Sequence, residues 1–533
     1  MIYFDTNVLV YSLDPDSRFH ASAVEQIQAA VETGRFALPS VVLQEFYAVA
    51  TDTREREQPL TPQEAAHYIH QLREMAASVD PVTDQLVVEA VNSAPRLGIT
   101  HYGIYDHLIA TMMHHYGVET LVTANDRDFR RYPDLHIIPL APNDAEPQTR
   151  AKRFIPYGRQ WIDEDDIAAV DRVLRSDYLT TGPEVDAFEA DLASYTGARY
   201  CVAVSSATAA LHIAVAALDL PAGSEGITSP NTFVASANCM VYNGLTPHFA
   251  DIDPDTFNID PVEIERAITT ETRLLIPVHF AGRACDMERI SGIARQAELH
   301  VIEDAAHAIG SRYPNGSRVG SCDYSDMTVF SFHPVKTMTT GEGGAITTND
   351  EQLYRKLLML RSHGITRDSA LMTQNPGPWY YEMQSLGFNY RMTDIQAALG
   401  RSQLAKLDRF IARRVELVQR YHEKLSGVAW LTTPDASQDQ HTCFHLYVVR
   451  IDWEMLAMDR TTVMNTLRDS GIGTQVLYIP VHTQPYYRDH LGYRPGDFPI
   501  AASYYNEALA LPLFPAMTDA DQQRVMSTIR SLA

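Results

Sequence analysis

Cysteine is scarce in this 533-residue sequence: there are five, and no two form a C-x-x-C pair. A scattered, odd-numbered set argues against a disulfide framework or a zinc site and favours a reducing compartment. No basic stretch precedes the first apolar run, so we expect no signal peptide. No uninterrupted apolar run is long enough to span a bilayer. These absences predict a cytoplasmic protein without a membrane partner.

Positive charge is also in short supply. The sequence has 43 Lys and Arg against 67 Asp and Glu, for a net charge of -24. This balance argues against broad attraction to nucleic acid or anionic lipid, although it is compatible with a local basic patch. The chain is too long for one compact core, so we expect two or three domains.

Short apolar runs alternate with helical patterns over residues 1–140. The patterns predict strands at 2–4, 36–38, 120–122 and 136–138, and helices at 21–31, 41–51, 61–76, 83–94 and 105–116. The helix at 61–76 opens with a Thr-Pro-Gln-Glu capping box. Strands that alternate with helices predict a small parallel α/β sheet.

A polar segment with two prolines, residues 141–152, predicts a linker. The longer region after it is again α/β. It has strand patterns at 200–204, 226–228, 274–278 and 300–303, and a helix-rich stretch at 393–425.

Acidic residues mark the front region at the places where strands end and helices begin. Asp5 follows the first strand, Glu45 and Asp106 lie in helices, and Asp128 follows the strand at 120–122. The carboxyl ends of parallel strands share one crevice, where converging acids repel one another unless Mg²⁺ or Mn²⁺ neutralises them. The alternative is that these acids are helix caps. That alternative is weaker for Asp5 and Glu45, because each interrupts an apolar run.

These residues resemble the PIN domain, the nuclease fold of VapC-type toxins. The matching motifs are Phe4-Asp5-Thr6-Asn7, Leu43-Gln44-Glu45-Phe46, Tyr105-Asp106-His107 and Thr123-Ala124-Asn125-Asp126-Arg127-Asp128. The resemblance implies that Asp5, Glu45 and Asp106 bind metal, with Asn125 or Asp128 at the fourth position. It also implies Mg²⁺-dependent RNA cleavage. The alternative is an inactive module that docks RNA or an antitoxin-like protein.

A lysine in the second region follows an apolar run. Lys336 comes after Val329-Phe330-Ser331-Phe332 and precedes the glycine-rich stretch 341–344. Upstream, Asp304 ends the strand pattern at 300–303. A lysine that holds an aldehyde as an imine and a carboxylate that pairs with a protonated pyridine nitrogen are the minimum equipment for pyridoxal phosphate chemistry. The alternative for Lys336 is a solvated surface lysine.

Two further features suit the same cofactor. Small and hydroxyl residues, including Ala207 and Thr208, stand where a strand passes into a helix, a junction that favours phosphate. Ser331 and the glycines near Lys336 could complete this phosphate site. Phe233 lies in a loop where it could stack on a pyridine ring. Taken singly, a serine at such a junction is often an N-cap and a phenylalanine is more often core.

The order of these parts resembles the DegT/DnrJ/StrS sugar aminotransferases, over about residues 153–533. Pro156-Tyr157-Gly158-Arg159-Gln160-Trp161 and Leu179-Thr180-Thr181-Gly182-Pro183 match the family as well. The resemblance implies a fold type I enzyme, with a large domain at 153–400 and a smaller α+β domain at 401–533. Lys336 would be the catalytic lysine, and the cofactor-binding residues would be Asp304, His307, Phe233, Ala207, Thr208 and Ser331. Glycine is more usual at position 207.

The segment Gly387-Phe388-Asn389-Tyr390-Arg391-Met392-Thr393-Asp394 also matches this family. There it reaches into the neighbouring subunit's site, so the resemblance implies a homodimer with shared active sites. Asn389 would donate to the partner's cofactor phosphate.

Several stretches look most like the branch of the family in the pseudaminic acid pathway, among them 361–366, 378–383 and 478–482. This likeness implies UDP-2-acetamido-2,6-dideoxy-β-L-arabino-hexos-4-ulose as the amino acceptor and L-glutamate as the donor. One alternative is another UDP- or dTDP-linked 4-keto sugar. The other is a chain that acts chiefly as a ribonuclease, with the larger region as an oligomerising scaffold.

Overall fold

The computed structural model describes all residues except 15–16, 53–58, 101–102, 142–153, 437–438 and 533. It divides the chain into two units, Met1–Arg153 and Phe154–Ala533. The predicted linker lies, apart from residue 141, outside the described residues. The finer domain boundaries stay predictions. In the part of the chain that is described, no helix is both long and apolar enough to cross a membrane.

The first unit is built on a five-stranded sheet in the order β3-β2-β1-β4-β5, in which all neighbours are parallel. This confirms the predicted parallel sheet. The strands are β1 (Ile2–Phe4), β2 (Phe36–Pro39), β3 (Ser78–Asp80), β4 (Thr120–Thr123) and β5 (His136–Pro139). The helices are α1 (Thr6–Ser12), α2 (His20–Glu32), α3 (Ser40–Ala50), α4 (Pro62–Met75), α5 (Asp84–Ser93), α6 (Gly103–Tyr116) and α7 (Asp126–Phe129), with a 3₁₀ turn at Ala94–Leu97.

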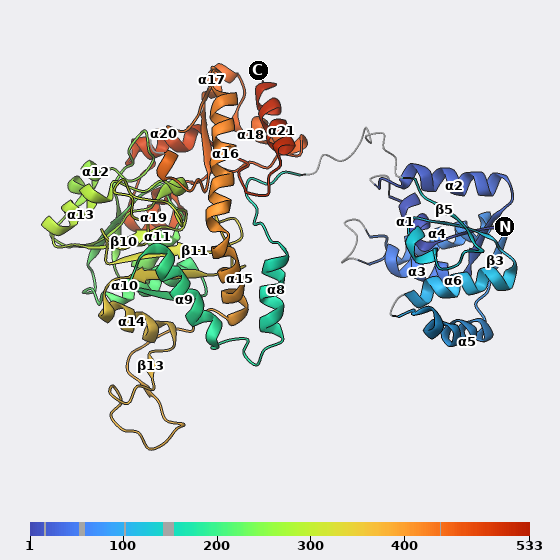
Figure 1. The fold of residues 1–533 in the computed structure, drawn as a ribbon. Coiled ribbons are helices and arrows are strands. Elements are labelled where there is room, and N and C mark those ends of the chain that lie inside the picture. Colours follow the sequence, from blue (N-terminus) through green and yellow to red (C-terminus); the bar gives the residue numbers. More distant parts are fainter. Residues whose placement is uncertain (15–16, 53–58, 101–102, 142–153, 437–438, 533) are drawn as a thin grey trace. The chain divides into compact units, whose positions relative to one another are not determined.

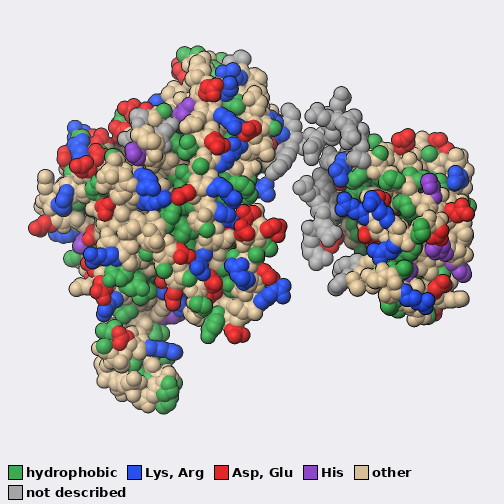
Figure 2. Space-filling view, in the orientation of Figure 1, with side chains coloured by type: hydrophobic (Ala, Val, Ile, Leu, Met, Phe, Trp, Pro, Cys, Tyr) green, Lys and Arg blue, Asp and Glu red, His purple; other side chains and the backbone are tan. Residues whose placement is uncertain are grey.

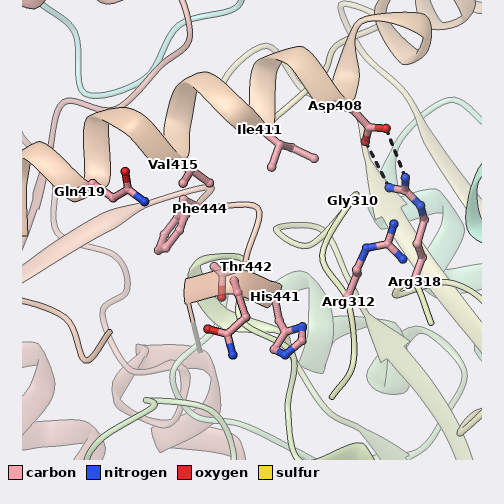
Figure 3. Close-up of a pocket in the computed structure, with 11 residues that line it drawn as sticks. Gly310, Arg312, Arg318, Asp408, Ile411, Val415, Gln419, His441, Thr442 and Phe444 are labelled. Carbon is pink, nitrogen blue, oxygen red and sulfur yellow. Dashed lines mark hydrogen bonds and ion pairs between the residues drawn. The ribbon is translucent and has the colours of Figure 1, made fainter. Parts of the chain in front are cut away.

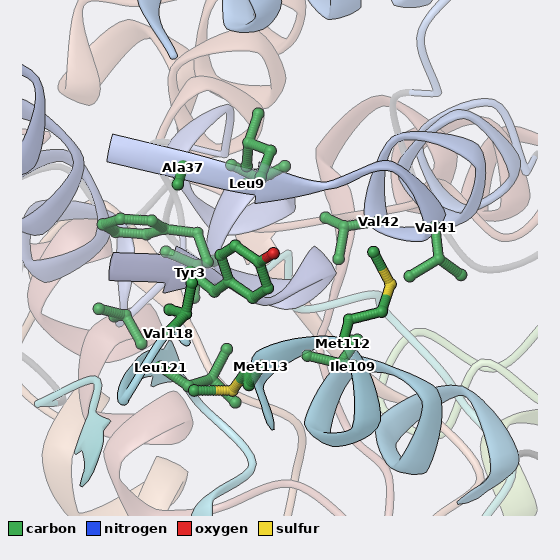
Figure 4. Packing of buried hydrophobic residues seen from close by; sticks show 14 of the residues in the cluster. Tyr3, Leu9, Ala37, Val41, Val42, Ile109, Met112, Met113, Val118 and Leu121 are labelled. Atoms are coloured by element: carbon green, nitrogen blue, oxygen red, sulfur yellow. The ribbon is translucent and has the colours of Figure 1, made fainter. Parts of the chain in front are cut away.

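The core of this unit lies between the sheet and its helices (Figure 4). Tyr3 of β1 and Leu121 of β4 are fully buried against Met112 and Met113 of α6 and their neighbours. Helices flank the sheet in Figure 1, so its central strands are continuous apolar runs rather than alternating ones. The predicted capping box at Thr61 is present, with Glu64 as its partner.

The second unit contains a seven-stranded sheet in the order β6-β12-β11-β10-β9-β7-β8. Only β12 runs against its neighbours. The strands are β6 (Tyr200–Val204), β7 (Glu225–Thr228), β8 (Thr246–Phe249), β9 (Thr272–Ile276), β10 (His300–Asp304), β11 (Met327–Ser331) and β12 (Gly344–Thr348). Strand β9 begins two residues before the predicted start, and β10 extends to include Asp304.

Alternate residues of these strands enter two separate cores. On β10, Val301 joins the core with α9 (Pro183–Thr196) and α13 (Met287–Gln296). Ile302 joins the core with α10 (Ala207–Ala217) and α11 (Ala235–Tyr242). Helices α8 (Glu164–Leu174), α12 (Pro261–Ala267) and α14 (Glu351–Arg361) also belong to this part, with a 3₁₀ turn at Phe280–Gly282.

The C-terminal part begins with the predicted helix-rich stretch. This stretch consists of α15 (Asp394–Ala405) and the long α16 (Leu407–Leu425). Helix α16 packs on α21 (Asp519–Arg530) and on an antiparallel sheet. The strands of that sheet are β15 (Leu431–Thr432), β16 (Tyr447–Ile451) and β17 (Ala508–Leu511). The remaining helices are α17 (Trp453–Leu456), α18 (Arg460–Asp469), α19 (Pro485–Leu491) and α20 (Pro499–Glu507), with 3₁₀ turns at Asp439–His441 and Val481–Thr483.

A two-stranded arm, β13 (Ile365–Thr366) with β14 (Glu382–Met383), projects from the body of this unit (Figure 1). On the face shown in Figure 2, acidic and basic side chains are interspersed over the same unit.

Candidate functional site

Two consecutive acids end strand β10, and the structure gives them different surroundings. The Glu303 carboxylate is fully buried and accepts hydrogen bonds from Tyr313 Oη at 2.6 Å and Ser325 Oγ at 2.5 Å, and it pairs with His279 at 2.7 Å. The Glu303 carboxylate is therefore engaged by partners inside the core. The Asp304 side chain lies at the carboxyl edge of the sheet, where ligands bind in open α/β folds. This is the acid that the sequence singled out.

A buried serine holds the Asp304 carboxylate. Ser236 Oγ donates to Asp304 Oδ2 at 2.6 Å, and the Ala306 N–H donates to Oδ1 at 3.1 Å. Because Ser236 gives its proton to Asp304, the hydroxyl of Thr232, 2.7 Å away, donates to Ser236 in turn. Ser236 lies on α11 and belongs to no motif, so its role could not be predicted from the sequence.

Lys336 lies in the turn that follows β11, and its backbone N–H donates to His333 O at 2.9 Å. Burial lowers the pKa of its ammonium to about 8, against the opposing influence of the Asp304 carboxylate. The structure therefore brings the predicted lysine and the predicted acid within electrostatic reach. A solvated surface lysine would show no such depression.

His307 and two aromatic rings form the next layer. Its Nδ1 accepts from the Ala281 N–H at 3.3 Å, so the neutral ring donates from Nε2 to Tyr478 Oη at 2.9 Å. Burial and the nearby Lys336 ammonium hold the pKa of His307 well below its usual range. The Tyr478 ring stacks on His307 with 5.9 Å between centroids, and Phe233 lies 6.2 Å from Tyr478. Phe233 is 56% exposed, so one face of its ring is open.

The predicted phosphate residues meet where α10 packs on β12. Ser331 of β11 is paired with Gly344, and a Cβ on Gly344 would lie 2.6 Å from the Ala207 nitrogen. Only glycine allows this approach. The Ser206 hydroxyl caps α10 by accepting from the Ala209 N–H. The first N–H groups of the helix, those of Ala207 and Thr208, are thereby left at its positive end, a suitable place for phosphate.

Asn389 is exposed and does not join this group within the chain. Its backbone pairs with Ser362, and the next residue accepts a backbone hydrogen bond from Ser205 at the start of the phosphate site.

These residues fit pyridoxal phosphate by the chemistry of the groups that they present. A carboxylate lies within electrostatic reach of a buried amine of lowered pKa. An exposed aromatic ring adjoins Tyr478, which stacks on His307, and Gly344 allows the close approach of a helix N-terminus to β12. Tyr478 was not predicted as a site residue either, because it lies 171 residues from His307 along the chain.

The acids of the first unit lie within electrostatic reach of one another. Burial and the carboxylates of Asp5, Asp128 and Glu45 together raise the pKa of Asp106 to about 7. Burial also raises the pKa of Asp5 to about 6, opposed by the hydrogen bond from Thr123 and reinforced by Glu45. These four acids therefore influence one another electrostatically, and their role as a metal site stays a prediction.

Asp5 and Asp128 both have hydrogen-bond partners in this structure. Asp5 accepts from the Thr6 N–H at 2.7 Å and from Thr123 Oγ1 at 2.6 Å, and so it also caps α1. Asn125 donates to Asp128. Within the described ranges, no three His, Cys, Asp or Glu side chains are arranged as a metal site. The donor chemistry suits a hard cation, but the arrangement does not enclose one.

Comparisons with known proteins cover both units. The PIN domain pattern matches residues 2–135, and that of the DegT/DnrJ/EryC1/StrS aminotransferase family matches residues 160–530. The spore coat polysaccharide biosynthesis protein SpsC of Bacillus subtilis (strain 168) is 42% identical over 384 residues, covering 72% of this chain and 98% of SpsC.

Solved structures agree with this assignment. Helicobacter pylori PseC, an aminotransferase involved in the biosynthesis of pseudoaminic acid, has a TM-score of 0.66 at 29% identity, over 71% of this chain and 99% of PseC. The pyridoxal phosphate form of Spr1654 from Streptococcus pneumoniae has a TM-score of 0.65 at 30% identity, over 71% and 98% of the two chains. Both predicted fold types are thus confirmed: the chain carries a PIN domain at its N-terminus and belongs to the DegT/DnrJ/EryC1/StrS aminotransferase family.

Proposed function

We propose that the chain transfers the amino group of L-glutamate to a nucleotide-linked 4-keto-6-deoxy sugar, with pyridoxal phosphate held at Lys336. The observation that carries this proposal is that Lys336 lies within electrostatic reach of Asp304, at the carboxyl edge of the larger sheet. When bound there, pyridoxal phosphate would supply an electron sink for negative charge at the substrate carbon.

The chain's own residues would perform the proton transfers. With a pKa of about 8, the Lys336 amine has a sizeable neutral fraction near neutral pH and can take a proton at Nζ, then return it. Asp304, held in place by hydrogen bonds from Ser236 and Ala306, would hold a proton on the ring nitrogen. His307 and Tyr478 would set how deeply the cofactor's pyridine ring lies in the site, and Phe233 would cover the exposed face of that ring.

The acceptor that we propose is UDP-2-acetamido-2,6-dideoxy-β-L-arabino-hexos-4-ulose. The likeness to PseC supports it, as do the motifs at 361–366, 378–383 and 478–482. The relative SpsC, named for spore coat polysaccharide biosynthesis, supports a surface-glycan role without specifying the sugar. Another UDP- or dTDP-linked 4-keto sugar is the alternative within the same chemistry.

The test is amine formation on this UDP-linked keto sugar with glutamate, in wild type, Lys336→Ala and Lys356→Ala. Lys356 is a matched control, because it is a half-buried helix lysine that pairs with Asp219, away from the Asp304 carboxylate. We expect the first variant to lose the activity and the second to keep it. Wild type that transaminates only other keto sugars would overturn the acceptor. Wild type that transaminates none would overturn the proposed function.

Attachment of the cofactor has a test that does not depend on turnover. The sequence has only five lysines, at 152, 336, 356, 406 and 424. Borohydride reduction followed by peptide mapping should place the pyridoxyl group on Lys336 alone. A label shared among several lysines would contradict the assignment.

A homodimer is part of the proposal. The arm that carries β13 and β14 exposes large apolar side chains, with Trp379 at 70% and Leu386 at 76% exposure. Such exposure fits a surface that a second copy covers. Sedimentation should therefore give a dimer. In the dimer, Asn389→Ala should weaken pyridoxal phosphate binding, and a monomeric wild type would refute the shared site.

A second candidate function is Mg²⁺-dependent RNA cleavage by the PIN domain, favoured by the mutual influence of Asp5, Glu45, Asp106 and Asp128. Titration calorimetry with MgCl₂ tests it, because a cation should bind wild type and bind Asp106→Asn far more weakly. RNA cleavage that requires Mg²⁺ and is lost in Asp106→Asn would support the nuclease. Neither binding nor cleavage would leave the domain as a docking module for RNA or an antitoxin-like protein.

A further inference from the structure

A cavity of about 570 Å³ lies on the larger unit, apart from the residues of the Lys336 site (Figure 3). Helix α16 forms one wall through Ile411 and Val415. The segment after Asp304, with Gly310, Arg312 and Arg318, forms another. The volume lies within the range of small-molecule sites.

Two arginines dominate the charge of this cavity. Arg312 and Arg318 are direct partners in an antiparallel β-bridge, so their side chains leave the same face of the hairpin. Like charges directly opposite each other destabilise such a pair unless an anion lies between them. Among the described residues that line the cavity, Asp408 is the one acid, against two guanidinium groups. This local excess of positive charge stands out in a chain of net charge -24.

Arg318 is only loosely engaged by that acid. Both guanidinium contacts with Asp408 are 3.3 Å long, beyond the usual 2.7–2.9 Å of a charge-assisted bond, and Asp408 is 68% exposed. The guanidinium carbon also lies 3.9 Å above the Tyr195 ring, which fixes its plane. The Arg318 guanidinium is thus held in position, and its N–H donors make only long hydrogen bonds to Asp408.

Arg312 has still more N–H donors available for a ligand than Arg318. Its Nη1 donates to the Gly316 carbonyl at 2.8 Å, and it makes no ion pair with any described residue. Its backbone N–H donates to His441 O, which ties the hairpin to the opposite wall of the cavity. Figure 3 shows the Arg312 and Arg318 side chains next to each other, with His441 across from Arg312.

We propose that this cavity is a second ligand site, which binds a phosphorylated small molecule with its phosphate between Arg312 and Arg318. A phosphate dianion matches two guanidinium charges and can accept from both at once. Ile411, Val415 and Phe444 provide an apolar wall for the body of the ligand. This site is independent of the proposed transamination.

Inorganic pyrophosphate is the probe, titrated by calorimetry into the full chain saturated with pyridoxal phosphate, in Mg²⁺-free buffer. Saturation fills the cofactor's own phosphate site, and the absence of Mg²⁺ prevents binding through the acids of the first unit. We expect one site per chain in wild type. Arg312→Gln should raise the Kd about tenfold or more, because a charge-assisted hydrogen bond is lost.

Arg355→Gln is the matched control, since Arg355 is an exposed helix arginine whose partner is Glu351. Its Kd should stay within about twofold of wild type. Asp408→Asn should bind more tightly, because it removes the competing carboxylate from Arg318. This gain cannot arise from misfolding.

Equal affinity in wild type and Arg312→Gln would overturn the proposal, as would equal weakening by Arg355→Gln. Asp408→Asn that binds no more tightly would overturn it too. Succinate that binds as tightly as pyrophosphate would refute the assignment to phosphate.

Discussion

Lys336, the proposed cofactor-binding lysine, lowers the stability of the fold at neutral pH. Below pH 8 its ammonium is charged in both the folded and the unfolded chain, and the folded state bears the cost of burying that charge. Because the folded pKa of about 8 lies below the ordinary value of 10.5, the unfolded chain binds more protons between these pH values. Folding stability from this group therefore rises as the pH rises through that window.

We expect Lys336→Met to stabilise the cofactor-free larger unit by about 1–3 kcal/mol at pH 7, because it removes a buried charge. The advantage should shrink between pH 8 and pH 10. All four tryptophans (Trp161, Trp379, Trp430 and Trp453) lie in this unit, so urea unfolding followed by tryptophan fluorescence reports on it alone. A variant less stable than wild type at pH 7 would contradict the argument.

Ser236 presents the complementary case, a residue that acts through another. Removing its hydroxyl leaves Asp304 Oδ2 without its 2.6 Å donor. Ser236→Ala should lower kcat by about tenfold, since one buried hydrogen bond to a charged group is worth about 1.5 kcal/mol or more. The pH dependence of the bound cofactor's visible absorbance should shift as well. Loss of activity with an unchanged absorbance titration would point to a purely structural role.

At the level of elements, the sequence predicted several strands that are continuous apolar runs and missed others, among them β3 and β12. β1 and β6 are continuous apolar runs, and their bounds were predicted correctly. β3 is three half-buried residues, Ser-Val-Asp, whose strand character comes from pairing with β2. β12 opens with Gly344, which a sequence pattern assigns to a glycine-rich loop. Only the approach of α10 shows why glycine stands there.

The residues of the candidate site also divide into those that the sequence predicts and those that it does not. Lys336 and Asp304 could be predicted because each puts a charge at the end of an apolar run. Ser236 and Tyr478 could not, because their importance lies in contacts with Asp304 and His307 that the fold alone creates. The acids of the PIN domain were predicted as a group, whereas the hydrogen bonds that already engage Asp5 follow only from the packing of β1 against β4.

The junction of β12 and α10 gives a prediction with an internal control. In Gly344→Ala the new Cβ would meet backbone atoms of Ser206 and Ala207 at 2.6 Å, so strand and helix must separate. We expect a loss of about 2–4 kcal/mol in unfolding free energy and weaker pyridoxal phosphate binding. Gly292→Ala, in the middle of α13, meets no atom within 4 Å and should stabilise the unit by about 0.5–1 kcal/mol. Equal behaviour of the two variants in tryptophan-monitored unfolding would exclude a special role for the junction.

For the whole molecule, the question is whether the two units depend on each other. Each has its own sheet and its own buried core, and their core residues form separate clusters. The two units have about 150 and about 380 residues, and a unit of either size with its own core is large enough to fold alone. The acids of the first unit are also independent of the Lys336 site, since each cluster's hydrogen-bond partners lie within its own unit.

We therefore expect a chain that begins at Phe154 to keep the kcat of the full chain within about twofold and to unfold at the same urea concentration.

Asp106→Asn in the full chain should likewise leave transamination unchanged. It should also raise the stability of the metal-free first unit by about 1–2 kcal/mol, because it removes one of the mutually repelling carboxylates. That unit has no tryptophan, so its unfolding is followed by far-ultraviolet circular dichroism, after subtraction of the transition seen by fluorescence. A large drop in kcat for either chain would mean that the PIN domain supports the aminotransferase directly. Unchanged kcat would mean that any regulation between the two depends on a ligand, a partner or RNA.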